Sequence, residues 1–393
     1  MYTLFMEIEK FKASPVGTLV PIKGEHLGRP FSHFAFVPND PPLEVALSAP
    51  ALRALGEAAA AIGRLDGAGR RLPKPALLVR PTIRREAVST SALEGTFTTL
   101  PQVMQSELFE AEGTHPRDVE EVLAYVRASE EGFAQMGEGK PLSLNLIKKL
   151  HGILVRNAPD IADPDKGDFR HRQNFVGPRD SRVEDSHFVP PPPGDVLTTG
   201  LHRWEEWIHR EEIPLLVRVA FGHYQFEALH PFVDGNGRIG RLIAILMLLE
   251  NRHLTVPLLS ISPYLEARDD EYRQRLRDVS MTGDFDSWLL FFLLALKASA
   301  EEGLEKSERL LALRDEMVAV LRGRRIRGLA IQATEDLIGS PVLTPSSMAG
   351  RYDVTYQAAV YAIKSMLKAG ILEEVEMGPR RVYLAHRVLE VLR

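Results

Sequence analysis

The amino-acid sequence predicts a mainly α-helical fold: an all-helical core with a β-hairpin flap, a helical amino-terminal domain and a carboxy-terminal winged helix-turn-helix. Three observations lead to this prediction. Apolar residues recur with helical period through most of the segment from Pro116 to Lys297. One stretch inside that segment is poor in helix formers. The carboxy-terminal segment from Thr344 alternates helix-like and strand-like runs.

Length and composition limit the class of protein. The chain has 393 residues, of which 45% are hydrophobic and 26% charged, and its net charge is −5. This is the composition of a soluble globular protein that is long enough for two or three domains. We expect an amino-terminal domain over residues 1–115, a core over residues 116–300, and a connector helix with a winged-helix domain over residues 301–393.

Two absences in the sequence indicate a compartment. The chain has no cysteine, which excludes disulfide bonds and thiolate metal sites and fits a reducing environment. Its first residues show no basic region followed by an apolar stretch of signal-peptide length, and its longest apolar runs fall well short of a membrane span. We therefore expect a cytoplasmic protein that does not interact with membranes.

The amino-terminal domain is expected to begin irregularly and to continue as helix. Six prolines punctuate residues 1–42, which predicts loop and extended chain wrapped over a core. From Leu43 the stretch "SAPALRALGEAAAAIGRL" is rich in alanine and has helical period. The stretch "PTIRREAVSTSALEGT" predicts a second helix that stops at Gly95.

The helix-poor stretch inside the core runs from Gly167 to Asp195. Residues with β propensity lie on either side of a Gly-Pro turn, and four consecutive prolines follow them. This pattern predicts a hairpin or exposed flap.

The carboxy-terminal segment has the element order of a winged helix. After about Ala300 a charged amphipathic helix is expected as a connector. A short helix, a turn at Asp353, a longer helix ending at Gly370 and two short strands then follow, which is typical of the winged-helix pattern. From Thr344 to Arg393 seven basic and five acidic residues give a local charge of only +2. DNA binding, protein interaction and dimer support therefore all stay open.

The segment "HPFVDGNGRIGR", from His230 to Arg241, carries the chemistry. Its three glycines precede or begin an apolar helix, whose first-turn N–H groups form an anion site that glycine lets a ligand approach closely. Asn236 adds a side-chain donor, and Arg238 and Arg241 can grip separate phosphate groups. Asp234 fits beside phosphate as a ligand of a divalent cation such as Mg²⁺. The imidazole of His230 can accept a proton near neutral pH. The segment predicts a nucleoside triphosphate cradle with a general base.

A zinc site is the alternative for the residues just before this segment. His223, Glu227 and His230 fall at i, i+4 and i+7 on one helical face, a spacing that could ligate a metal ion. His223 and Glu227 could instead form a local hydrogen-bonded pair that orients the loop. The phosphate interpretation explains the residues after His230 better.

The segment from His230 to Arg241 matches, at every fixed position, the Fic-family signature His-x-Phe-x-Asp/Glu-Gly-Asn-Gly-Arg-x-x-Arg. The resemblance to that family extends over roughly Pro116–Lys297. The preceding residues resemble the companion domain of Fic cores, and the winged helix resembles a frequent appendage. Fic proteins mostly transfer AMP from ATP to a protein hydroxyl. The resemblance therefore implies an adenylyltransferase that uses ATP and Mg²⁺ and acts on Tyr, Thr or Ser of a target protein and of itself.

The resemblance also implies roles for single residues. His230 would deprotonate the target hydroxyl, and Asp234 would hold Mg²⁺. Glycine at position 237, where the phosphotransferase branch has lysine, favours AMP transfer. For Tyr272, near the nucleotide base in relatives, ordinary packing is the alternative. The nucleotide would be bound by Gly235, Asn236, Gly237, Arg238, Gly240 and Arg241 at its phosphates, and by Phe175, Val176, Gly177 and Tyr272 elsewhere.

The flap resembles the family hairpin that covers the nucleotide and aligns the target. An exposed strand edge there could pair with an extended target segment through main-chain hydrogen bonds. The target protein is therefore expected to dock at the flap, and relatives of this architecture often form homodimers.

The motif Thr90-x-x-x-Glu94-Gly95 resembles the inhibitory motif of Fic proteins. The resemblance implies that Glu94 pairs with Arg241 and keeps this arginine from the γ-phosphate. The same glutamate could position a water that removes AMP, and a solvated glutamate is the plain alternative.

A DNA-binding regulator is the competing class of protein. It would act through the second helix of the winged-helix segment, whose polar residues suit either DNA or solvent: Tyr356, Gln357, Tyr361, Lys364 and Lys368.

Overall fold

The computed structural model describes residues 5–44, 46–72, 74–108, 116–178, 182–377 and 380–392. The protein is mainly helical, which confirms the predicted fold class, and its described part holds two small antiparallel sheets. The chain divides into two compact units. Unit 1 comprises Met1–Ile62, Arg127–Leu254 and Tyr264–Ala298, and unit 2 comprises Gly63–Val126, Thr255–Pro263 and Ser299–Arg393.

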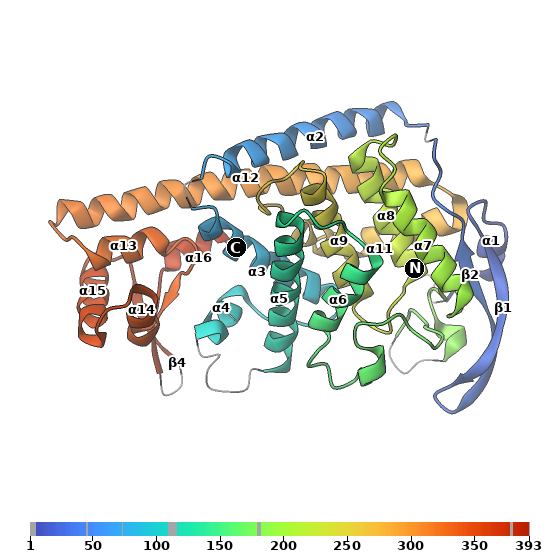
Figure 1. Ribbon diagram of the computed structural model, residues 1–393, viewed down its shortest axis with the longest axis horizontal. Coiled ribbons are helices and arrows are strands. Elements are labelled where there is room, and N and C mark those ends of the chain that lie inside the picture. Colours follow the sequence, from blue (N-terminus) through green and yellow to red (C-terminus); the bar gives the residue numbers. More distant parts are fainter. Residues whose placement is uncertain are drawn as a thin grey trace. The chain divides into compact units, whose positions relative to one another are not determined.

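Unit 1 contains one β-hairpin and a set of helices (Figure 1). Its own elements are α1 (Ile8–Lys12), β1 (Gly17–His26), β2 (Arg29–Pro38), α6 (Leu144–Leu154), α7 (Asp195–Ile208), α8 (Leu215–Leu229), α9 (Asn236–Glu250) and α11 (Asp269–Thr282), with short 3-10 turns at Asp163–Asp165 and Val183–Asp185. Four helices have residues in both units: α2 (Ala49–Gly69), α5 (Arg117–Gly137), α10 (Ser262–Glu266) and α12 (Phe285–Gly323).

The centre of unit 1 is the pair α8 and α9. Nearly every residue of α8 is buried, and so is every residue of α9 from Asn236 to Leu248. Such helices are apolar on all sides because neighbouring elements cover each face. Gly240 lets the two helices approach closely, since a Cβ there would lie 2.5 Å from Oε1 of Glu227 on α8. The loop that joins α8 to α9 is therefore anchored at each end by a buried helix.

The amino-terminal residues differ from the irregular chain that their prolines predicted. β1 and β2 pair over ten residues each, from Gly17 opposite Pro38 to His26 opposite Arg29. The two-residue turn places Leu27 at φ 51° and Gly28 at φ 72°, as the tight hairpin turn requires. Proline removes a ladder donor, but a two-stranded sheet has two open edges where this is tolerated. The prolines therefore lie within and around strands that the sequence analysis missed.

Unit 2 contains helices and a three-stranded sheet. Its own elements are α3 (Ala76–Ala92), α4 (Leu100–Leu108), α13 (Leu329–Asp336), β3 (Val342–Leu343), α14 (Pro345–Tyr352), α15 (Tyr356–Lys368), β4 (Glu373–Met377), β5 (Arg380–Leu384) and α16 (His386–Leu392). The strand order is β3-β5-β4, with both pairs antiparallel.

Threonines start the two helices that precede the β4–β5 pair. The Thr344 hydroxyl accepts a hydrogen bond from the Ser347 N–H (3.0 Å) at the start of α14, and the Thr355 hydroxyl accepts one from the Ala358 N–H (3.2 Å) at the start of α15. These are N-caps of the ordinary kind. Asp353, at φ 50°, ends α14 and turns the chain toward α15.

The core and the predicted connector share one helix. The residues on either side of position 300 belong to α12, which runs unbroken for 39 residues. The other predicted domain boundary adjoins residues 109–115, which lie outside the described part of the chain. In that described part, no helix is both long and apolar enough to cross a membrane.

Candidate functional site

The residues from His230 to Gly235 form a short loop between α8 and α9, and both ends of this loop have left-handed backbone. His230 is the C-cap of α8, at φ 47° and ψ 61°. Gly235 is the N-cap of α9, at φ 80°. Glycine adopts this conformation freely, whereas a histidine does so at a cost that the surrounding structure must offset. The backbone turns sharply at the predicted base and again at the start of the predicted phosphate-binding helix.

Arg170 holds this loop from within the protein. It is 1% exposed. Its guanidinium donates to the carbonyl oxygens of His230 (2.8 Å), Leu229 (3.3 Å) and Pro191 (2.6 Å). Burial lowers the pKa of Arg170 to about 10. This value is still well above neutral pH, so the guanidinium is charged there. The sequence analysis missed this role because every residue type has a backbone carbonyl, so a sequence does not show which carbonyls an arginine will bind.

Asn236 fastens the loop from its other end. Its Oδ1 accepts the N–H of Phe232 (2.8 Å), and its Nδ2 donates to the carbonyl of the same residue (2.9 Å). Asn174 also donates to the Phe232 carbonyl (2.7 Å). The side-chain amide of Asn236 is therefore committed to the loop, which leaves its backbone N–H as the group that can meet a phosphate.

His151 is a second support that sequence reasoning missed. Its ring stacks on Phe232 at 3.8 Å between centroids. Its Nδ1 accepts the Gly167 N–H (3.1 Å), so Nε2 carries the proton and donates to the Asp234 carbonyl (3.0 Å). Burial is the main cause that lowers the pKa of His151, to about 4. The neutral ring satisfies both bonds, and protonation would break the one at Nδ1.

Asp234 is the acid of the loop. Its Oδ1 accepts the Gly235 N–H (2.6 Å) and lies 3.7 Å from Nη2 of Arg238, and its side chain is 47% exposed. Arg238 and Arg241 follow on the first turns of α9, where they are 5% and 2% exposed. A half-exposed carboxylate beside buried cations fits a Mg²⁺ ion held by one protein ligand and by phosphate oxygens. Among the described residues, no three His, Asp or Glu are grouped as an all-protein metal site requires.

His223 and Tyr272 lie in the core of unit 1. His223 is 1% exposed and its Nε2 bonds the Tyr272 hydroxyl at 2.8 Å. Burial lowers the pKa of His223 to about 3, so the ring is neutral. Tyr272, on α11, is 4% exposed, which favours the packing role that the sequence analysis left open for it. Gly240 leaves space for the carboxylate of Glu227, which lies where a Cβ at position 240 would be.

Within its described residues, the predicted flap contains a single antiparallel β-bridge in place of a regular hairpin. Val176 pairs with Phe188: the Val176 N–H donates to the Phe188 carbonyl at 2.9 Å, and the Phe188 N–H donates back at 3.2 Å. Phe175 is half-buried and Gly177 is exposed. The tip, residues 179–181, lies outside the described residues.

In unit 2, Thr90 and Glu94 lie at the end of α3. Thr90 is fully buried and Glu94 is exposed. Gly95 adopts φ 86° and the Thr96 N–H reaches back to the Ser91 carbonyl (2.9 Å), which ends the helix. Earlier on the helix, buried Glu86 accepts the Ser260 hydroxyl and the Ser262 N–H, each at 2.9 Å.

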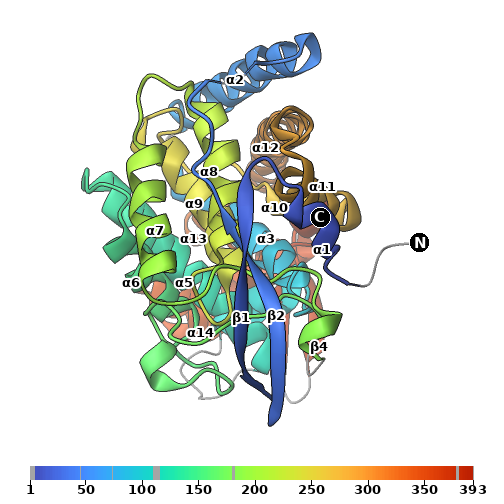
Figure 2. The same cartoon turned by 90° about the vertical axis from the view of Figure 1, so that its right-hand side faces the viewer.

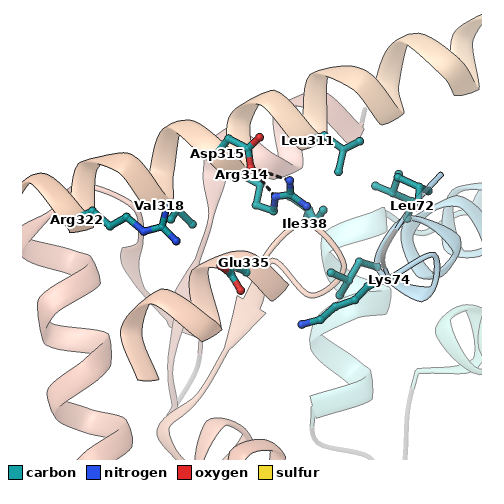
Figure 3. Close-up of a pocket in the computed structure, with 11 residues that line it drawn as sticks. Leu72, Lys74, Leu311, Arg314, Asp315, Val318, Arg322, Glu335 and Ile338 are labelled. Atoms are coloured by element: carbon teal, nitrogen blue, oxygen red, sulfur yellow. Dashed lines mark hydrogen bonds and ion pairs between the residues drawn. The ribbon is translucent and has the colours of Figure 1, made fainter. Parts of the chain in front are cut away.

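Unit 2 also has a cavity of about 340 Å³. Its lining residues come from α12, α13, the start of α3 and the chain just before α3 and just after α13. Figure 3 shows apolar Leu311 and Val318 and charged Arg314 on α12, and charged Glu335 on α13. None of the predicted site residues lines it.

Two family models match the chain. The model described as Fic/DOC family N-terminal matches residues 52–134, and the model described as Fic/DOC family matches residues 141–248, which include the loop between α8 and α9. Over these segments the chain belongs to the Fic/DOC family.

Relatives with a known name are similar over part of their length. The chain is 29% identical to "Protein adenylyltransferase Fic" of Drosophila melanogaster over 199 residues, which is 49% of this chain and 36% of the relative. To the protein of the same name from Drosophila erecta it is 34% identical over 111 residues, 28% of this chain and 20% of the relative. The chain thus matches well under half the length of these relatives.

One solved structure shares the fold over almost its whole length. It is a Fic family protein from Desulfovibrio desulfuricans G20, with a TM-score of 0.56 at 19% identity, and the match covers 88% of this chain and 98% of that chain.

Proposed function

We propose that the protein is an adenylyltransferase that moves AMP from ATP to a hydroxyl side chain of a target protein and of itself. The observation that carries this proposal is the loop from His230 to Gly235. It joins a histidine in left-handed backbone to a helix N-terminus with two buried arginines. The relatives named protein adenylyltransferase Fic support it over the matched part of their length.

The first turn of α9 supplies the phosphate site. Its N–H groups have no acceptor within the helix and lie at the positive end of the helix dipole. Arg238 and Arg241 add two cations for the β- and γ-phosphates. Arg170, Asn236 and His151 hold the loop, so that these groups are preorganised for a ligand.

His230 is the base in this proposal. It takes the proton from the target hydroxyl as the oxygen forms a bond to the α-phosphorus. The bond from that phosphorus to the bridging oxygen of the β-phosphate breaks, and pyrophosphate leaves. Asp234 would hold Mg²⁺, which supplies charge neutralisation at the phosphates when it is bound.

ATP labelled at different phosphates tests the reaction type. The chain is incubated with lysate proteins and with ATP labelled at either the α- or the γ-phosphate. We expect label on protein from the α-phosphate only, in agreement with glycine at position 237. Label from the γ-phosphate would mean phosphoryl transfer and would overturn the proposal.

We further propose that Glu94 restrains the enzyme by competing for Arg241. The support for this brake is the motif Thr90-x-x-x-Glu94-Gly95. One guanidinium cannot pair fully with both a carboxylate and a phosphate. Removal of AMP by a water that Glu94 positions is the alternative role, and it predicts that label on a modified protein persists when Glu94 is replaced.

Nucleic-acid binding through a carboxy-terminal winged helix is a second candidate function. The observation that favours it is a contact between Arg324 and the end of α15, where Nη1 donates to the Lys368 carbonyl at 2.5 Å. This contact brings an exposed basic segment, residues 322–327, beside the helix that carries exposed Lys364 and Lys368. Basic side chains on and around one exposed helix suit a phosphate backbone.

A further inference from the structure

The flap is bonded to the amino-terminal residues of unit 1 as well as to itself. The Met6 N–H donates to the Ser186 carbonyl at 2.7 Å, and the Phe36 N–H, in β2, donates to the Val189 carbonyl at 2.8 Å. The same stretch of flap pairs with Val176 through Phe188. The hairpin of β1 and β2 and the flap thus share one hydrogen-bonded arrangement.

Apolar packing joins the same two segments. Val189 belongs to a buried cluster with Met6, Phe11, Ala35, Phe36 and Met281, and Phe175 and Phe188 pack against this cluster. The Phe188 ring lies 5.9 Å from that of Phe11 and 6.0 Å from that of Phe36. This apolar packing holds the end of β2 around Phe36 against the flap.

The distal part of the hairpin, residues 23–32 (the hairpin tip), contacts the flap through aromatic rings. Phe175 lies between two rings of the tip, 4.8 Å from His26 and edge-on to Phe31 at 5.2 Å. Figure 2 shows the length of the hairpin. Since an isolated two-stranded hairpin is marginally stable in water, the tip and Phe175 order one another, and such coupling is reciprocal.

We infer that the hairpin tip positions the flap, with Phe31 and His26 as positioning residues that fix Phe175. This inference rests on the proposed function for its consequence, because Phe175 is a residue of the flap expected to align the target. The phosphate site is held by other contacts, those of Arg170, Asn236 and His151. The tip therefore governs transfer to protein without contributing to the phosphate site.

Two matched substitutions in β2 test this inference. Phe31→Ala removes a ring from Phe175. Phe34→Ala makes the same change three residues further along the strand, at a side chain that is 41% exposed and has no ring contact among the described residues. Hydrogen–deuterium exchange measured by mass spectrometry follows the amides of Val176 and Phe188. We expect about two- to tenfold faster exchange there in Phe31→Ala, the size of effect that one aromatic pair supports, and no change in Phe34→Ala. Equal flap exchange in both variants and the wild type would overturn the inference.

Transfer is measured on the same proteins with α-labelled ATP, together with ATP affinity by calorimetry. We expect Phe31→Ala to lower the rate of self-labelling about two- to tenfold at saturating ATP, a larger change than any in the dissociation constant of ATP. A loss of ATP affinity without a change in flap exchange would also overturn the inference. A wild-type chain that transfers no label would refute the proposed function instead, and the exchange data would still decide whether the tip holds the flap.

Discussion

At the scale of single residues, the histidines in and around the loop between α8 and α9 differ in the role that we assign to them. His230 has left-handed backbone at the end of a buried helix, and its carbonyl is held by Arg170. His151 and His223 are buried more deeply, at 0% and 1% exposure; the ring of His151 is bonded at both nitrogens to backbone groups, and Nε2 of His223 bonds the Tyr272 hydroxyl. Of these three histidines, His230 is the one that we assign to proton transfer.

The variant His230→Ala tests this assignment. We expect AMP transfer to fall by about two to four orders of magnitude, the usual contribution of a general base, while ATP affinity measured by calorimetry changes little. His202→Ala, at an exposed histidine on α7, is the matched control and should keep full activity. Transfer at the wild-type rate by His230→Ala would show that another group takes the proton.

His151 makes the stability of the protein sensitive to acid. Its folded pKa, about 4, lies below the value of about 6.5 for an unfolded histidine, so the unfolded chain binds more protons between these values. The contribution of His151 to the free energy of unfolding is therefore fully present above about pH 6.5, and it falls by up to about 3 kcal/mol as the pH drops toward 4. Urea unfolding at several pH values measures this loss. Gln in place of His151 keeps a donor and an acceptor but does not titrate, so we expect a shallower fall. Equal pH profiles for the two proteins would rule out this role.

Glu94→Gly is the residue-scale test of the brake. Freeing Arg241 from a charge-assisted pair worth about 1.5–3 kcal/mol should raise self-labelling about ten- to hundredfold. The added change Arg241→Ala should abolish the gain. A solvated glutamate predicts no change in rate or in nucleotide affinity. Following the loss of label in the same sample distinguishes a brake from a role in AMP removal, since only the latter makes the label persist.

At the scale of elements, two segments distant in sequence hold the backbone of the loop between α8 and α9. Arg170 and Asn174 lie in the first part of the flap, and His151 lies on α6. Each of them bonds main-chain atoms between Leu229 and Asp234. The element is therefore rigid before any ligand arrives, which favours stabilisation of charge as it develops.

Arg170→Met should show how much this grip contributes. It leaves buried carbonyls without their charged donor, and we expect a loss of about 3 kcal/mol or more in the free energy of unfolding, measured with urea. Arg170→Lys keeps the charge but cannot reach all the carbonyls, so its free energy of unfolding should lie between those of the wild type and Arg170→Met. Arg156→Met, at an exposed arginine, is the control. An unfolding free energy for Arg170→Met equal to that of the control would mean that the guanidinium bonds are not supporting the loop.

At the scale of the whole molecule, charge decides which partners can bind. A net charge of −5 gives no general attraction for nucleic acid, so any such binding must come from a local patch. The exposed basic groups on and beside α15 form the patch that we propose.

Charge reversal at this patch tests nucleic-acid binding by the full chain. We expect Lys364→Glu with Lys368→Glu to weaken binding to a mixed-sequence DNA duplex. The salt dependence should also become shallower, by about 0.9 in the log–log slope for each phosphate that the protein no longer neutralises. The control reverses Arg70 and Arg71, which are also exposed. Fluorescence anisotropy at several salt concentrations measures both. No binding by the wild type, or equal binding by both double variants, would exclude α15 as a DNA-binding element.

The sequence by itself determined the helical class and the position of the chemical residues. Helical period and N-capping are local properties, so α8, α9, α14 and α15 could be predicted from short windows. The spacing from His230 to Arg241 predicted that the proposed base, an acid and two arginines lie close together, because one turn and the start of one helix carry them all.

Only the tertiary structure decided how this segment is held and what surrounds it. The partners of Arg170 and His151 are backbone groups from distant segments, and such partners carry no residue type that a sequence could reveal. Tyr272 meets His223 across 49 residues of chain, and the hairpin of β1 and β2 is stabilised by packing against the flap and α1. Contacts of this range depend on how the elements pack, and periodicity describes only the face that each element buries.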